Sequence, residues 1–281
     1  MPDPHRAAGA PGKVLSITSL ANPIVKEIRG LALPKNRRSS GLFVAEGLKL
    51  VADAMEANWT IRDFVHAARA AEEPHVARLA AQARARGGDV ISVSEAVLAK
   101  ITRRENPQTV IGVFQQRLLP MTQIRAEAAP VWVVLENIRD PGNLGTIIRT
   151  SDAVGAGGVI LVGDTVDPFS IEAVRATMGS VFHVPIARLT RIEFETLRRR
   201  WPGTVAGTHL AGAVDYRSVT YEAPTLLVMG NEQAGLSPDM AALCDVLVKI
   251  PMAGKADSLN LAIATGVMLF EVLRGRLKLD G

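Results

Sequence analysis

Short apolar runs alternate with helix-like segments through the first 117 residues. The runs are bounded by Gly, Pro and charged residues, as strands of a small sheet usually are. The segment at 74–86 has Pro in its first turn and Gly-Gly at its end, which is typical of a helix. This pattern predicts an α/β unit with strands at 42–45, 61–65, 90–93 and 110–114, and helices at 47–57 and 74–86.

From residue 131 onward the apolar runs become continuous rather than alternating. A continuous apolar run of strand length is typical of a strand buried on both faces, as in parallel sheets. Strands separated by helices favour the same arrangement. The predicted strands are 131–135, 158–162, 182–186, 204–207, 226–229 and 246–250, and the predicted helices are 146–154, 170–178, 191–201 and 259–273.

The change of pattern divides the chain into two α/β domains. A length of 281 residues suits two domains of ordinary size. We expect a loose tail at 1–12, an N-terminal domain at 13–118, a linker at 119–129, and a C-terminal parallel-sheet domain at 130–281.

Composition narrows the class of protein. The chain is 48% hydrophobic and 21% charged, which is typical of a globular protein. No apolar run approaches the roughly 20 residues of a membrane helix, so no membrane partner is expected. The single cysteine, Cys244, cannot form an internal disulfide, which favours a cytoplasmic location. No thiol cluster or histidine spacing indicates a metal site.

Basic residues are concentrated near the N-terminus. A net charge of +4 permits a nucleic-acid partner without requiring one. Basic side chains bind RNA phosphates, but a cluster this small is equally typical of a solvated surface. The candidates for RNA contact are Lys26, Arg29, Lys35, Arg37 and Arg38, with a second polar group at Arg103, Arg104, Asn106 and Gln108.

Three polar, Gly-containing loops follow predicted strands of the second domain, at 136–145, 230–237 and 250–260. Ligands of open α/β sheets bind outside the carboxyl ends of the strands, where such loops gather. The loops lack G-x-G-x-x-G and Walker patterns, so a conventional dinucleotide or nucleotide site is not predicted.

The same loops belong to three stretches that resemble the SpoU (TrmH-like) branch of the SPOUT RNA methyltransferases: NIRDPGNLGTIIRTSDAVGA, LVMGNEQAGLS and IPMAGKADSLNLAIATGVMLFE. SLANPIVKEIRGL, GLFVAEGLKLV and NPQTVIGVF resemble the substrate-binding domain of that family. The resemblance implies transfer of a methyl group from S-adenosylmethionine to a ribose 2′-hydroxyl of tRNA or rRNA. It also implies a catalytic domain with a deep trefoil knot, and a homodimer.

The resemblance assigns roles to individual side chains, each of which also has a simpler interpretation. The resemblance assigns Arg149 to the activation of the 2′-hydroxyl. Because arginine is a poor base, we expect Arg149 to bind RNA phosphate and stabilise alkoxide charge, or else to pair with Asp152. Asn143 would orient Arg149 or the ribose, or only form a turn. Glu232 would orient its polar neighbours, or be an exposed loop acid. Ser258 and Asn260 would belong to the catalytic site, or cap the last helix.

The family positions that hold the cofactor, largely through backbone groups, correspond to Gly230, Ile250 and Leu259. Thr208 and His209 are weaker candidates for the same pocket. The sequence departs from the common family pattern at 233–234 and at 261–263. The apolar helix at 259–273 needs more cover than its own sheet, which the expected dimer would provide.

Three other functions fit the sequence less well. A catalytically silent RNA-binding protein would not need every motif position. A base-methylating SPOUT enzyme lacks this set of polar residues, and a small-molecule enzyme would need another catalytic group. The long N-terminal domain favours rRNA over tRNA by analogy.

Overall fold

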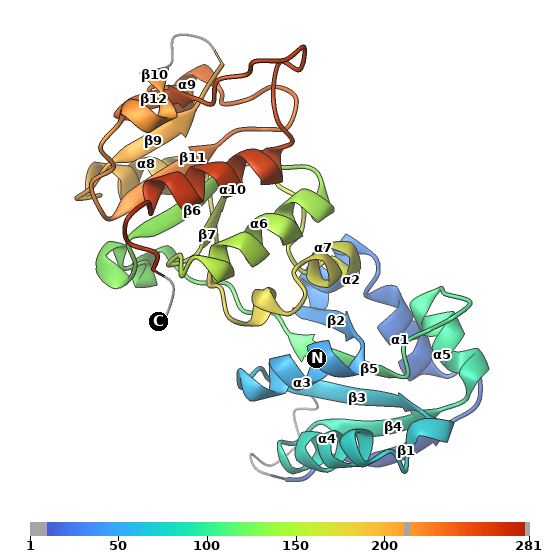
Figure 1. Cartoon of the computed structure of the whole chain (residues 1–281). Coiled ribbons are helices and arrows are strands. Elements are labelled where there is room, and N and C mark those ends of the chain that lie inside the picture. Colours follow the sequence, from blue (N-terminus) through green and yellow to red (C-terminus); the bar gives the residue numbers. More distant parts are fainter. Residues whose placement is uncertain (1–9, 211–213, 279–281) are drawn as a thin grey trace. The chain divides into compact units, whose positions relative to one another are not determined.

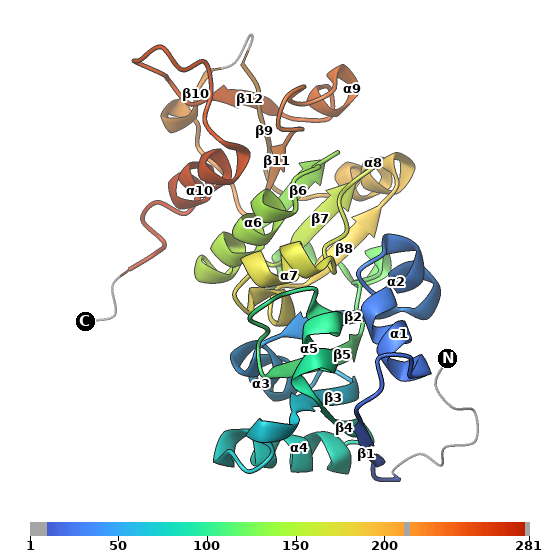
Figure 2. The same cartoon turned by 90° about the vertical axis from the view of Figure 1, so that its right-hand side faces the viewer.

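The computed structural model describes residues 10–210 and 214–278, which form two compact units (Figures 1 and 2). One unit contains the chain up to Gln116 together with Phe169–Phe182, and the other contains Arg117–Pro168 and the chain from His183. Each unit has its own sheet. Most of the expected tail at 1–12 lies outside the described residues.

The first unit is built on a mixed sheet in the order β1-β4-β3-β5-β2. Strands β1, β4 and β3 are parallel, and β5 runs antiparallel to both β3 and β2. The strands are β1 (Val14–Ile17), β2 (Leu42–Glu46), β3 (Ile61–Ala67), β4 (Asp89–Val93) and β5 (Val110–Gln115). The helices are α1 (Pro23–Gly30), α2 (Pro34–Ser40), α3 (Leu48–Glu56), α4 (Pro74–Ala85) and α5 (Glu95–Thr102).

The segment Phe169–Phe182 completes the core of this first unit. Its helix α7 (Ile171–Ala176) contacts β2, and its two terminal phenylalanines enter an aromatic cluster. The Phe169 ring centroid lies 4.9 Å from that of Phe43, and Phe182 lies 5.4 Å from Trp59. The strand predicted at 182–186 is therefore wrong. Phe182 is buried among aromatic rings, and the strand β8 (Ile186–Leu189) begins four residues later.

The second unit contains a seven-stranded, all-parallel sheet in the order β10-β12-β9-β11-β6-β7-β8. The parallel sheet predicted from continuous apolar runs is confirmed; the trefoil knot stays a prediction. Besides β8, the strands are β6 (Val131–Glu136), β7 (Val159–Val162), β9 (Val205–Thr208), β10 (Val214–Asp215), β11 (Thr225–Met229) and β12 (Val246–Lys249).

Helices cover both faces of the parallel sheet. Helix α8 (Arg191–Arg199) packs Phe194 and Leu197 against one face, where Trp132 of β6 also lies. Helices α6 (Pro141–Ala153) and α10 (Leu261–Val272) lie side by side over the other face (Figures 1 and 2). The short helix α9 (Pro238–Ala241) leads into β12. Because the strands are parallel, all of their following loops emerge at one edge.

Helix α6 starts five residues before the predicted start at 146. The Asp140 carboxylate accepts a hydrogen bond from the backbone N–H of Asn143 at 2.6 Å, and Pro141 occupies the first helical position. Both features are typical of a helix N-terminus. Asn143 therefore lies in the first turn of a helix rather than in a free turn.

Candidate active site

A cavity of about 310 Å³ opens at the carboxyl ends of β9, β11 and β12. Its lining includes all three predicted cofactor-binding residues, Gly230, Ile250 and Leu259, and two of the predicted catalytic residues, Glu232 and Ser258. The weaker candidates Thr208 and His209 also line it. Its volume lies within the range of small-molecule pockets. Asn143, Arg149 and Asn260 are not part of the lining.

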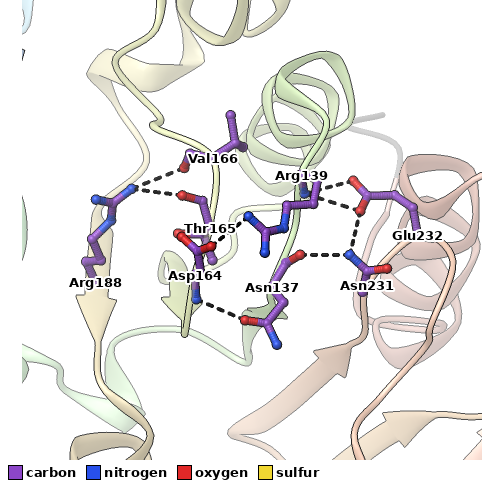
Figure 3. Close-up of polar contacts among 8 residues, drawn as sticks. All are labelled: Asn137, Arg139, Asp164, Thr165, Val166, Arg188, Asn231 and Glu232. Carbon is purple, nitrogen blue, oxygen red and sulfur yellow. Dashed lines mark hydrogen bonds and ion pairs between the residues drawn. The ribbon is translucent and has the colours of Figure 1, made fainter. Parts of the chain in front are cut away.

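Glu232 lines this cavity and accepts several hydrogen bonds, of which Figure 3 shows those from Arg139 and Asn231. Its carboxylate accepts from the backbone N–H groups of Arg139, at 3.2 Å, and Asp140, at 3.0 Å. The Asn143 and Asn231 amides also donate to it, at 3.4 and 3.3 Å. Glu232 therefore connects the loop after β11 to the start of α6. It is not a free loop acid.

These contacts determine the charge of Glu232. Partial burial raises the pKa of the carboxyl, but hydrogen bonds from the Asp140 and Arg139 backbone and from Asn143 outweigh it, so the pKa lies below its usual range. Hydrogen bonds to the charged form stabilise that form. Glu232 is therefore a carboxylate at neutral pH and serves as a hydrogen-bond acceptor.

Asn143 and Asn260 connect the first and third motif loops. The Asn260 amide donates to the Asn143 side-chain oxygen at 2.9 Å. The Asn260 oxygen also accepts from the backbone N–H groups of Ala262, at 2.9 Å, and Ile263, at 3.3 Å, and thereby caps α10. The capping interpretation of Asn260 is correct, and the same side chain also reaches the neighbouring motif. Ser258 is exposed at the cavity.

Arg149 lies on α6 with its side chain exposed to solvent. In the described part of the chain no carboxylate forms an ion pair with it, so the expected alternative of pairing with Asp152 is wrong. Helix α6 packs beside α10, with the Thr150 methyl group near Gly266. Arg149 therefore belongs to the helix that also carries Asn143 and packs beside α10.

Sequence reasoning missed two asparagines and one acid that hold the loops. The Asn231 amide donates to the Asn137 carbonyl at 2.9 Å, and its oxygen accepts from the Gln233 and Ala234 backbone. The Glu136 carboxylate, buried at the end of β6, accepts from the Ser237 hydroxyl at 2.6 Å. The available signal was the Gly-Asn step after β11, because Asn bonds its own backbone two residues on.

The tight path of the loop after β11 explains its glycine at 230. A Cβ atom at Gly230 would lie 2.1 Å from the carbonyl carbon of Gly235. Any side chain would push the two ends of this loop apart, and the Asn231–Gly235 bridge would be lost. The glycine therefore keeps the loop closed beside the cavity.

The basic cluster of the first unit requires one correction. Arg37 is only 2% exposed, and its guanidinium donates to the carbonyls of Leu31, at 2.8 Å, and Ala32, at 3.0 Å. It holds the connection between α1 and α2 and cannot contact RNA. The exposed members of the cluster are Lys26 on α1 and Lys35 and Arg38 on α2, while Arg29 is half-buried.

The cavity suits S-adenosylmethionine in size and in lining. The lining combines the apolar residues Ile250, Leu259 and Leu261 with polar residues and the loop after β11. Such a mixture fits a ligand with an adenine ring and a charged amino-acid end. The described residues contain no group of three or more His, Cys, Asp or Glu side chains placed to hold a metal ion.

Comparisons with known proteins agree over both units. Residues 130–270 match the SpoU rRNA Methylase family, and residues 22–112 match the MRM3-like substrate binding domain. The crystal structure of an AdoMet-bound rRNA methyltransferase from Sinorhizobium meliloti superposes with a TM-score of 0.89. It is 53% identical in sequence and covers 95% of this chain and 100% of that chain.

Two relatives carry names that specify a reaction. The 23S rRNA (uridine(2479)-2'-O)-methyltransferase of Streptomyces viridochromogenes is 31% identical over 86% of this chain and 86% of its own length. The 23S rRNA (guanosine(2553)-2'-O)-methyltransferase RlmP of Bacillus subtilis is 29% identical over 92% of this chain and 99% of its own length. The chain therefore belongs to the SpoU family of RNA ribose 2′-O-methyltransferases, which use S-adenosylmethionine.

Proposed function

We propose that this enzyme methylates a ribose 2′-hydroxyl of rRNA, with the cofactor in the cavity and the acceptor ribose beside Glu232 and Asn143. The main support is the Glu232–Asn143–Asn260 network, because it joins all three motif loops next to the cavity. A network of this kind is pre-organised, so the reacting groups need little rearrangement when the RNA binds.

The residues at the cavity have different proposed roles, which follow from their chemistry. Gly230, Ile250 and Leu259 hold the adenosine part of the cofactor, and bound S-adenosylmethionine supplies an electrophilic methyl group. Glu232 orients the amide of Asn143, which can then donate to or accept from the ribose. Ser258, exposed at the cavity, is placed to contact the cofactor or the ribose.

Arg149 stabilises the negative charge that develops on the 2′-oxygen. A guanidinium keeps its proton at neutral pH, so Arg149 does not act as the base. Its exposure and lack of an ion pair within the described residues leave it available for the RNA. The proton passes to water or to another group.

The choice of rRNA rests on the relatives. Both the Streptomyces and the Bacillus relatives are named as 23S rRNA 2′-O-methyltransferases, and the Sinorhizobium structure is named as an rRNA methyltransferase. These relatives align along nearly the whole chain, including the N-terminal unit. We assign RNA binding to residues 13–118 and catalysis to residues 130–281. We place the enzyme in the cytoplasm because its single cysteine, Cys244, suits a reducing compartment.

A homodimer built on α10 is part of the same proposal. Ile263, Gly266, Val267 and Phe270 share one face of this helix, and Ile263 and Phe270 are 55% and 56% exposed. Apolar side chains of this size gain roughly 1.5–3 kcal/mol each when buried. We expect sedimentation equilibrium to show a dimer for the wild type and a monomer for Phe270→Asp; a monomeric wild type would contradict the dimer.

The decisive experiment measures methyl transfer. Radiolabelled S-adenosylmethionine is incubated with the enzyme and with rRNA or tRNA from a strain that lacks the gene, and the RNA is digested to nucleosides. We expect label in a 2′-O-methyl nucleoside from rRNA. Label in tRNA would replace the proposed substrate, and label on a base would contradict the reaction.

A further inference from the structure

Arg139 and Asp164 form an ion pair at the carboxyl edge of the catalytic sheet (Figure 3). The Arg139 guanidinium lies 2.7 Å from the Asp164 carboxylate, and the two side chains are 62% and 80% exposed. Exposed ion pairs contribute little to stability, so Arg139 can leave Asp164 for another anion at a small cost in free energy.

Both partners are held at their backbones. The Asp164 N–H donates to the Asn137 side-chain oxygen at 2.9 Å, and the residue follows Gly163, whose φ is +82°. The backbone N–H of Arg139 donates to Glu232. The backbone of Arg139 is therefore fixed next to Glu232 at the cavity, whereas its guanidinium can move.

The neighbouring arginines have partners that are less easily replaced. Arg188 donates to the carbonyls of Thr165 and Val166, at 3.5 and 3.2 Å, and so holds the loop that contains Asp164. Arg191 is 29% exposed and lies 3.6 Å from the buried carboxylate of Glu136. Of these three arginines, Arg139 alone has a single side-chain partner within the described residues, and that partner is an exposed acid.

The substrate must bring a phosphate to this place. In RNA the 3′-oxygen next to the 2′-hydroxyl carries a phosphate, so a ribose held beside Glu232 puts a phosphate within a few ångströms of it. Arginine binds phosphate with two parallel hydrogen bonds. Arg139 is suited to bind this phosphate, because its backbone N–H is bonded to Glu232 and its guanidinium is held by an exposed ion pair.

We propose that Arg139 binds the phosphate on the 3′ side of the methylated ribose, and that Asp164 holds Arg139 away from this position until RNA arrives. This inference rests on the proposed function and adds a substrate contact to it. Binding exchanges the carboxylate of Asp164 for the phosphate. Asp164 then repels the RNA, which makes it a residue that weakens substrate binding.

The test is a double-mutant cycle of Arg139→Ala and Asp164→Asn, with RNA binding measured at several salt concentrations. Arg139→Ala should weaken RNA binding about tenfold, since hydrogen bonds to charged groups are strong. It should also reduce the salt slope by about 0.7, the value for one phosphate contact on a single strand. Asp164→Asn alone should strengthen binding by about two- to fivefold. In the Arg139→Ala background, Asp164→Asn should strengthen RNA binding by a smaller factor than it does in the wild type.

The Arg217–Asp215 pair of the second unit provides a control. Its closest atoms also lie 2.7 Å apart, its side chains are 56% and 37% exposed, and neither residue lines the cavity. Arg217→Ala and Asp215→Asn should leave RNA binding and its salt slope unchanged; effects equal to those of Arg139→Ala and Asp164→Asn would overturn the proposal in favour of net charge. Weaker binding of RNA by Asp164→Asn, or an unchanged salt slope in Arg139→Ala, would also overturn it.

Cofactor binding and wild-type methylation separate this inference from the proposed function. Arg139→Ala retains the backbone N–H that holds Glu232, so its affinity for S-adenosylmethionine should equal that of the wild type in calorimetry. If wild-type enzyme methylates rRNA and the cycle shows no coupling, only the role of Arg139 fails. If wild-type enzyme methylates no RNA, the proposed function fails first.

Discussion

The polar residues of the two units are organised in opposite ways. At the edge of the parallel sheet, Glu232, Asn143 and Asn260 bond to one another and to backbone groups, so their positions are fixed by the fold. On α2 of the first unit, Lys35 and Arg38 are exposed and have no ion pair within the described residues. From this comparison we expect geometry to determine function in the second unit and charge to determine it in the first.

The largest effect should come from removing Arg149, whose guanidinium has no ion pair within the described residues. We expect Arg149→Ala to lower kcat for methyl transfer by about 10³-fold, because one group that stabilises transition-state charge is lost. Cofactor affinity should stay unchanged, since Arg149 does not line the cavity. Single-turnover methylation and calorimetry measure the two quantities, and near-normal turnover would remove Arg149 from the mechanism.

A smaller loss is expected when the network loses its central charge. Glu232→Gln keeps the shape of the side chain, but its amide nitrogen cannot accept hydrogen bonds from the Arg139 and Asp140 backbone. We expect kcat to fall by about 10²-fold, the effect of a displaced reacting group. Because the pKa of Glu232 lies below its usual range, the wild-type rate should not respond to this group near neutral pH. A rate that follows a Glu232 titration near pH 7 would contradict its role as a permanent carboxylate.

Much of the site could be predicted because parallel strands bring their following loops to one edge. Glu232, Gly230, Ser258 and Ile250 come from loops that the apolar runs located, and all four line the cavity. The connections between loops could not be predicted. The Asn231–Asn137 bond joins residues 94 positions apart, and only the assembled sheet brings them together.

Local patterns failed where distant packing decided the outcome. The run at 182–186 was predicted as a strand on its apolar residues, yet Phe182 packs with Trp59 more than a hundred residues earlier. Nothing local in the sequence indicates that Phe169–Phe182 leaves one unit to complete the core of the other. The start of α6 differs for another reason: Asp140 and Pro141 lie in the loop predicted at 136–145, although an Asp-Pro step can also begin a helix.

The smallest and most specific prediction separates charge from structure within the basic cluster. A Lys35→Ala/Arg38→Ala variant should weaken RNA binding by about tenfold and flatten its salt dependence, because both side chains are exposed and available to phosphates.

Arg37→Ala should behave differently. It leaves the buried carbonyl of Leu31 without its donor, so the free energy of unfolding should fall by about 1.5–3 kcal/mol. In the folded Arg37→Ala protein, the salt slope of RNA binding should equal that of the wild type. Salt titrations of RNA binding and thermal unfolding of both variants test the distinction. An unchanged slope in the double variant would return α1 and α2 to the role of a solvated surface, and the contrast between the two units would then rest on the catalytic loops alone.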